Sequence, residues 1–268
     1  SLAGPANKQG RIAADHICGK NSTYPGSQGS SVIKVFDMTA AVTGVNETNA
    51  RKAGLDVDKV ILSPMSHAGY YPGGKVMTMK VVFEKETYRI LGAQIVGYEG
   101  VDKRIDVLAT AIHAGMKAQD LAKLDLAYAP PYSSAKDPVN LAGFMIENIS
   151  DGTLKQFHIE DVKNLPHDGS VTLLDTRTPG EYQRGHVDGF VNIPVDNLRE
   201  RLDEIPKKNP VYVMCQSGLR SYIATRILEG NGYTSYNFSG GFRFYDAVMN
   251  DRCLIETATA CGMDLKEK

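Results

Sequence analysis

A short apolar run that leads into a cysteine loop constrains the fold more than any other feature of the chain. Residues 210–214 (PVYVM) are compact and apolar, as expected of a strand buried on both faces. The loop CQSGLRS follows at residues 215–221, and residues 219–229 have the apolar spacing of a helix. A strand that passes through a loop into a helix is typical of a parallel α/β sheet, whose ligands bind at the carboxyl ends of the strands.

Two domains of different class are predicted on either side of a break near residues 150–152. Before the break, residues 77–84 alternate apolar and polar side chains, residues 88–96 form the returning strand, and residues 101–114 form a helix. This pattern predicts an α+β domain with an antiparallel sheet covered by helices. After the break, strand and helix patterns alternate, which predicts an α/β domain with a central parallel sheet. A short helix ending at Val248 closes this second domain.

Composition and charge exclude several classes of partner and site. The formal net charge of −1 gives no basic field for nucleic acid or lipid, and no apolar run is long enough to span a membrane. The four cysteines form no C-x-x-C pair, so we expect no metal site. Their sparse, scattered placement favours a reducing, cytoplasmic location.

The cysteine loop has the features of a site that stabilises a thiolate. The backbone N–H groups of Gln216 through Arg220 are expected to curl around the sulfur of Cys215, with Gly218 providing the backbone freedom. The positive end of the following helix and the Arg220 guanidinium add to the effect. Such a cysteine is a nucleophile, and the same cradle would hold a persulfide. The alternative is a small apolar residue buried at a strand end.

The motifs of the second half resemble those of rhodanese-type sulfurtransferases. The loop is similar to the family's Cys-x-x-Gly-x-Arg loop, LLDTRTPGEYQRGHVDGFVNIP (173–194) to its upstream signature, and SGGFRFYDA (239–247) to its closing segment. Residues 152–252 are assigned to this domain. The resemblance implies that Cys215 and Arg220 are catalytic, and that the persulfide cradle consists of Gln216, Ser217, Gly218, Leu219 and Ser221. Related phosphatases have five residues between cysteine and arginine, whereas this loop has four.

Four upstream signature residues of the second half are expected to be structural: Asp175, Arg177, Glu181 and His186.

The first half resembles the pyridine nucleotide–disulfide oxidoreductases. Residues 1–26 are similar to the last segment of the family's FAD-binding domain, and residues 27–148 to its dimerisation domain. HAGYYPGG (67–74) and LDLAYAPPYSSAKDPVN (124–140) point to the branch of coenzyme A-disulfide reductases, NADH oxidases and persulfide reductases. The resemblance implies FAD, NAD(P)H and possibly coenzyme A for a longer protein, with Leu2, Ala3 and Gly4 against the flavin. No G-x-G-x-x-G follows a strand, so no cofactor is expected in this chain itself.

The same resemblance implies a homodimer in which Tyr70 and Tyr128 reach the partner's active site. Tyr71 and Tyr132 are close enough to leave this assignment open, and an interface anchor is the alternative role. Cys18 is expected in a packed helix without a function. Residues 253–268, with Cys253 and Cys261, are expected to form a polar tail.

Two functions follow from these patterns. The first is a sulfurtransferase that forms a persulfide on Cys215, taking sulfur from a persulfide, polysulfide or CoA persulfide donor and passing it to a thiol. It is expected to be fused to the dimerisation region of an FAD-dependent reductase. The second is a non-catalytic dimerisation and interaction module with a rhodanese fold.

Overall fold

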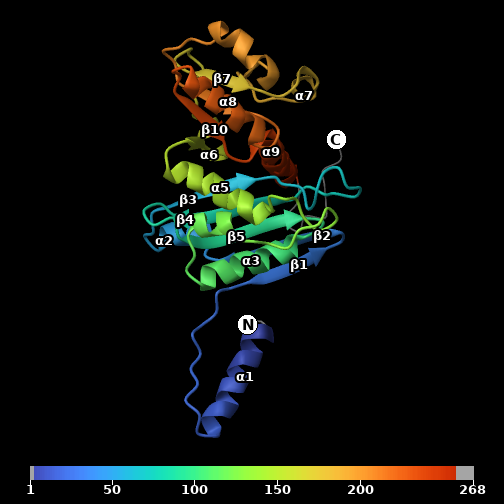
Figure 1. Ribbon diagram of the computed structural model, residues 1–268, viewed down its shortest axis with the longest axis vertical. Coiled ribbons are helices and arrows are strands. Elements are labelled where there is room, and N and C mark those ends of the chain that lie inside the picture. The colour runs from blue at the N-terminus through green and yellow to red at the C-terminus, as the bar shows by residue number, and fades with distance from the viewer. Residues whose placement is uncertain (1–2, 258–268) are drawn as a thin grey trace.

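The computed structural model describes residues 3–257. Two five-stranded sheets, one antiparallel and one parallel, form two domains in chain order, as the sequence predicts. Figure 1 shows the second domain, coloured yellow to red, stacked on the first. Within residues 3–257 we find no helix with the length and apolar character needed to cross a membrane.

The first domain is built on an antiparallel sheet with strand order β1-β2-β5-β4-β3. Its strands are β1 (Ser31–Val35), β2 (Met38–Gly44), β3 (Val57–Leu62), β4 (Thr78–Glu84) and β5 (Ile90–Gly97). Its helices are α2 (Glu47–Lys52), α3 (Val101–His113), α4 (Ala118–Lys123) and α5 (Pro138–Ser150). The N-terminal helix α1 (Ala3–Ile17) precedes them.

The β4–β5 hairpin confirms the predicted alternation. Met77, Met79, Val81 and Phe83 are at most 1% exposed and pack in one core with side chains of α3 and α5. The α5 helix begins where the sequence favours it, because the Asp137 side chain accepts a hydrogen bond from the Val139 amide and Pro138 occupies the first turn.

The second domain has a parallel sheet with strand order β6-β10-β9-β7-β8. Its strands are β6 (Gln156–Phe157), β7 (Thr172–Asp175), β8 (Val191–Asn192), β9 (Val211–Met214) and β10 (Ser235–Phe238). Its helices are α6 (Ile159–Val162), α7 (Pro179–Gln183), the 3-10 helix η1 (Val195–Glu204), α8 (Leu219–Gly230) and α9 (Gly241–Thr257).

Polar contacts join β3 of the first domain to the second domain. The Ile61 amide donates to Ser239 Oγ at 3.0 Å, and the side chain of Gln156 donates to the Lys59 carbonyl at 2.8 Å. The Lys59 ammonium, buried between the domains, pairs with Glu47 at 2.9 Å and with Glu160 of α6 at 2.8 Å. These contacts place the end of β3 against the edge of the parallel sheet.

The expectation of a packed N-terminal helix is wrong. Helix α1 stands apart from both sheets and has no buried side chain (Figure 1). In α8, the buried side is centred on Ala224 and Leu228, and Ile223 is exposed.

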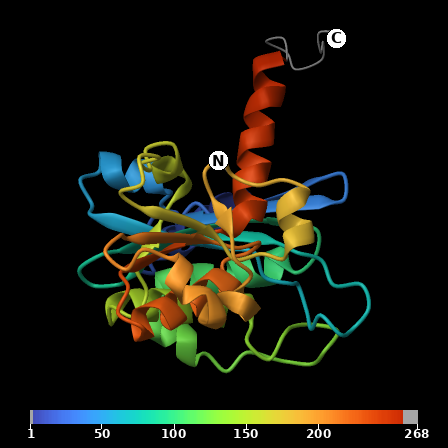
Figure 2. The same ribbon diagram turned by 90° about the horizontal axis from the view of Figure 1, so that it is seen from above.

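Helix α9 extends past Val248 to Thr257 and projects away from both sheets (Figure 2). The start of the expected tail, Cys253 included, is therefore helical, and residues 258–268 lie outside the described part of the chain.

Candidate active site

Cys215 lies at the carboxyl end of β9, in the loop that leads into α8. Gly218 precedes the helix with φ of 102°, a left-handed conformation that glycine adopts without strain. The Cys215 side chain is fully buried, and its Sγ accepts hydrogen bonds from the Gly218 amide at 3.1 Å and from Ser221 Oγ at 3.2 Å. Both donors favour a negative charge on the sulfur.

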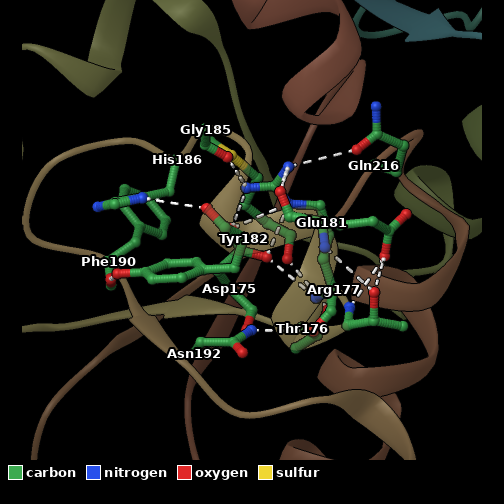
Figure 3. Close-up of polar contacts among 12 residues, drawn as sticks. Asp175, Thr176, Arg177, Glu181, Tyr182, Gly185, His186, Phe190, Asn192 and Gln216 are labelled. Atoms are coloured by element: carbon green, nitrogen blue, oxygen red, sulfur yellow. Dashed lines mark hydrogen bonds and ion pairs between the residues drawn. The ribbon is translucent and has the colours of Figure 1, made fainter.

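Fewer donors surround the sulfur than the sequence predicted. The Gly218 amide is the one backbone donor of the loop with hydrogen-bond geometry to Sγ, and the Ser221 hydroxyl is the second donor. The Gln216 side chain turns away to accept a hydrogen bond from Arg177 at 3.3 Å (Figure 3), and Leu219 is 66% exposed. Ser221, one of the residues expected to form the persulfide cradle, is in direct contact with the Cys215 sulfur.

Arg220, predicted to be catalytic, pairs with a carboxylate beside the loop. Its guanidinium forms two hydrogen bonds with the Glu181 carboxylate, at 2.7 and 2.8 Å. Hydrogen bonds from Arg220 lower the pKa of Glu181 to about 2, against a smaller opposing effect of burial. The same hydrogen bonds raise the pKa of Arg220, and an electrostatic interaction with Cys215 adds to this effect. Glu181 thus offsets much of the positive charge predicted at the loop.

A buried ion pair supports the start of the cysteine loop. Arg177 and Asp175, 1% and 0% exposed in their side chains, are joined at 2.7 Å. Arg177 also donates to the Gly185 carbonyl at 2.8 Å (Figure 3). Its guanidinium lies 3.9 Å from the centre of the Phe242 ring. Because Arg177 binds Gln216 as well, it holds the start of the cysteine loop in place.

His186 lies at the surface, away from the sulfur. Its ring stacks on Tyr182 with 4.0 Å between centroids and contacts the Tyr182 carbonyl at 3.2 Å (Figure 3). The Tyr182 hydroxyl in turn donates to the Phe190 carbonyl at 2.6 Å. These contacts agree with the structural role expected for His186.

Gly241, the second glycine after β10, packs against the backbone of the cysteine loop. Gly241 has φ of 69°, and a Cβ there would lie 2.6 Å from the Ser217 amide nitrogen. The next two amides donate to the loop: Phe242 to the Cys215 carbonyl at 2.7 Å and Arg243 to the Gln216 carbonyl at 3.1 Å. Only glycine allows this approach without displacing the loop.

The structure brings together two of the four candidate tyrosines. The hydroxyls of Tyr70 and Tyr128 lie 3.1 Å apart, and this hydrogen bond raises the pKa of Tyr128. Both rings are exposed. Tyr71 packs edge-on against His67 instead, with 5.6 Å between centroids, and Tyr132 is exposed in the neighbouring loop.

A buried arginine beneath these tyrosines was missed by the sequence reasoning. Arg104 of α3 is 1% exposed and binds Asp137 at 3.0 Å and the Ser66 carbonyl at 2.9 Å. Ser133 Oγ donates to the same carboxylate at 2.7 Å. The network ties together the two loops that carry Tyr70 and Tyr128. Its one sequence signal is an arginine between apolar positions of a helix, which alone does not identify a partner.

The residues expected against a flavin lie at the start of the chain. Leu2 is outside the described residues, and Ala3 and Gly4 are exposed at the start of α1. A Cβ at Gly4 would meet nothing within 4 Å. Cys18, expected in a packed helix, is exposed and forms no disulfide bond.

Comparisons with known proteins divide the chain in the same way. Residues 30–138 match the pyridine nucleotide-disulphide oxidoreductase dimerisation domain, and residues 158–247 match the rhodanese-like domain. Coenzyme A disulfide reductase of Staphylococcus epidermidis is 38% identical over 144 residues, which are 53% of this chain and 32% of that protein. The CoA-dependent NAD(P)H sulfur oxidoreductase of Pyrococcus abyssi is 41% identical over 138 residues, 52% of this chain and 31% of that protein.

Two solved structures match nearly the whole chain. Reduced Bacillus anthracis CoADR-RHD is 45% identical with a TM-score of 0.89, over 94% of this chain and 45% of that one. The NAD-dependent persulfide reductase of A. fulgidus is 43% identical with a TM-score of 0.81, over 90% of this chain and 44% of that one. The chain thus spans about a third of the curated relatives and less than half of these two structures. It carries a pyridine nucleotide-disulphide oxidoreductase dimerisation domain followed by a rhodanese-like domain, as do coenzyme A disulfide and persulfide reductases with a C-terminal rhodanese domain.

Proposed function

We propose that the second domain is a sulfurtransferase that carries sulfur as a persulfide on Cys215. The observation that carries this proposal is the pair of donors on one buried sulfur, the Gly218 amide and the Ser221 hydroxyl. A sulfur at the amino-terminal end of α8 also benefits from the helix dipole. This environment favours the thiolate, which is the nucleophilic form of cysteine.

The transfer takes two displacement steps. The Cys215 thiolate attacks the outer sulfur of a donor R–S–SH, a new S–S bond forms at Cys215, and the donor's S–S bond breaks with its electron pair leaving on R–S⁻. An acceptor thiolate then attacks the outer sulfur of Cys215–S–SH, and the Cys215 thiolate leaves. The outer sulfur keeps its proton throughout, and no oxidant or reductant is consumed. Gly218 and Ser221 stabilise the thiolate that leaves in the second step.

The remaining residues of the site act through position. Arg177 holds Gln216, and the Gly241 backbone supports the loop from behind. Arg220 adds a positive field that Glu181 partly offsets, so we assign it a positioning role in place of the predicted catalytic one.

We further propose the context in which this transfer occurs. The parent protein would be a cytoplasmic, homodimeric FAD-dependent reductase that uses NAD(P)H, with persulfide, polysulfide or CoA persulfide as sulfur donors. The names of the relatives, a coenzyme A disulfide reductase and a CoA-dependent sulfur oxidoreductase, support this. The hydrogen-bonded pair of Tyr70 and Tyr128 is exposed and available to a partner subunit.

A thiosulfate:cyanide sulfurtransferase assay tests the proposal. We expect activity in the whole chain and none in Cys215→Ser. Cys18→Ser is the matched control, because Cys18 is a free, exposed cysteine just after α1. Mass spectrometry of the donor-treated chain should show one added sulfur atom on the Cys215 peptide. Equal rates in the chain and in Cys215→Ser would refute the proposal.

The complete burial of Cys215 supports a second candidate, a docking module without catalysis. In that case the thiol is a packed side chain that reagents reach slowly. Iodoacetamide labelling of the native chain separates the two functions. Labelling of Cys215 faster than that of exposed Cys18 at neutral pH favours catalysis, and protection of Cys215 until the chain unfolds favours docking.

A further inference from the structure

A pocket borders the cysteine loop on the side that faces the first domain. It encloses about 460 Å³ between the two domains. The first domain contributes apolar side chains to it: Leu62, Pro64, Leu141, Phe144 and Met145. The opposite wall is formed by loop residues 217–219 and Tyr222 of α8. Gly218, whose amide donates to the Cys215 sulfur, is therefore part of this wall.

The two walls are fixed to each other. Asn148 of α5 donates to the Tyr222 hydroxyl at 3.3 Å, and both residues line the pocket. The hydrogen bond from the Ile61 amide to Ser239 joins the domains one residue before Leu62. The pocket is thus formed without a ligand, as is usual for small-molecule sites.

Two polar atoms of the lining residues have no hydrogen-bond partner among the described residues. They are Ser63 Oγ and Asn237 Oδ1. Asn237 is 2% exposed, and its amide group donates to the Gly218 carbonyl at 3.4 Å, so its oxygen is left over next to the loop. A buried polar atom without a partner destabilises the fold, and a ligand that pairs with it after a small side-chain rotation removes this cost.

The charge of the pocket favours an anionic end on the ligand. Lys136 is the single charged residue among those that line it, and its ammonium lies 6.0 Å from the centre of the Phe144 ring. A separate pocket of about 370 Å³ reaches the loop at Gln216 and is lined by charged residues of both signs: Arg177, Arg184, Arg243, Glu181 and Asp246. The two pockets share no lining residue, so the loop is approached by two surfaces of different chemistry.

We propose that the pocket between the domains binds the thiol that accepts sulfur, as an unbranched apolar chain with an anionic group at its far end. The inference deepens the proposed sulfurtransferase function and depends on it for the thiol's role. Apolar side chains hold the chain of the ligand, Lys136 pairs with its charge, and its sulfur lies at the loop wall. Cys215 itself has no exposed surface, and the outer sulfur of a persulfide stands about 2 Å beyond Sγ.

Binding to the whole chain is measured by calorimetry with the methyl thioether of mercaptohexanoate, which binds but cannot accept sulfur. We expect Lys136→Ala to weaken binding about tenfold, and Met145→Trp, which fills the pocket, to abolish it. Lys52→Ala is the matched control, because Lys52 is exposed on α2 outside the pocket. The methyl ester of the probe, which has no negative charge, should bind the unaltered chain more weakly than the acid does. The ester should bind Lys136→Ala as tightly as it binds the unaltered chain. No binding, or binding that neither variant changes, would overturn the proposal.

A second readout separates this site from the function. With thiosulfate as the donor, the ratio of kcat/KM for mercaptohexanoate to that for cyanide should fall about tenfold in Lys136→Ala. A ratio unchanged from that of Lys52→Ala would count against the acceptor's placement in the pocket. Probe binding is also measured on Cys215→Ser. If that variant binds the probe and the chain transfers no sulfur, the binding site stands and the sulfurtransferase function fails.

Discussion

Removal of the Ser221 hydroxyl tests the charge balance of the site directly. Ser221→Ala deletes one oxygen from a fully buried residue and leaves the Gly218 amide on the sulfur. The hydroxyl has a single proton and two acceptors, Cys215 Sγ at 3.2 Å and the Gly218 carbonyl at 3.1 Å. With a neutral thiol the proton can turn to the carbonyl, whereas a thiolate draws it to the sulfur. The substitution therefore affects the thiolate more than the thiol.

The size of the effect follows from this competition. A hydrogen bond to a charged group contributes about 1.5–3 kcal/mol. Because the thiol form keeps the alternative bond to the Gly218 carbonyl, we expect the lower end of this range, about 1.5 kcal/mol, which corresponds to roughly a tenfold weaker stabilisation of the thiolate relative to the thiol. The thiosulfate:cyanide rate and the rate of iodoacetamide labelling of Cys215 at neutral pH should both fall by about this factor.

A buried serine of the same domain provides the control for this substitution. Ser235 is fully buried and donates to the Thr225 carbonyl at 3.3 Å, without contact to the sulfur. Ser235→Ala should cost similar stability and leave both rates unchanged. If Ser221→Ala reacts at the rate of the unaltered chain, the hydroxyl does not stabilise the thiolate and the electrostatic account of the site is wrong.

Three further substitutions address the loop and its supports. Gly241→Ala forces a Cβ to 2.6 Å from the loop backbone, so sulfur transfer should fall at least about tenfold, while Gly230→Ala, whose Cβ would meet nothing within 4 Å, should retain activity; equal activities would contradict the packing argument. Lys59→Met leaves its carboxylate partners at the domain interface without their buried cation, and urea unfolding should show a loss of about 2–3 kcal/mol, less than the 3–5 kcal/mol typical of fully buried pairs because one partner is exposed. The pKa of Glu181 is lowered from 4.5 to about 2 in the folded chain, so its contribution to stability is present above pH 4.5 and lost as the pH falls toward 2. Glu181→Gln, which also weakens the hold on Arg220, should therefore destabilise the chain at pH 7 and make its unfolding free energy less dependent on pH in that window; an unchanged pH dependence would show that the carboxylate is not stabilised in the folded state.

Local patterns of the sequence predicted the elements that carry the site. The apolar run before Cys215 is β9, and the helix that follows begins at Leu219, as expected. These elements follow from side-chain periodicity, proline at a helix start and glycine at a strained turn, all of which act over a few residues. The loop residues around Cys215 were likewise predictable, because they are adjacent in the chain.

Partners of charged residues were not predictable in the same way. Glu181 and Arg220 are 39 residues apart, and Arg104 and Asp137 are 33 apart. Periodicity shows which apolar side chains are buried, but a charged residue in an amphipathic helix has the same pattern whether it faces solvent or a distant carboxylate. For this reason the sequence predicted a free Arg220 beside the sulfur and gave no sign of the Arg104 network.

The pairing of Arg220 changes which interactions must stabilise the sulfur. A free guanidinium would act through a long-range field, which physiological salt screens beyond about 8 Å. With Glu181 offsetting that charge, the stabilisation depends on two donors within 3.2 Å of a fully buried atom, where salt has little effect. A loop of nearly balanced charge also retains an anionic product less strongly than a free cation would. Weak retention suits a carrier, because the sulfur it accepts must leave again with the acceptor thiol.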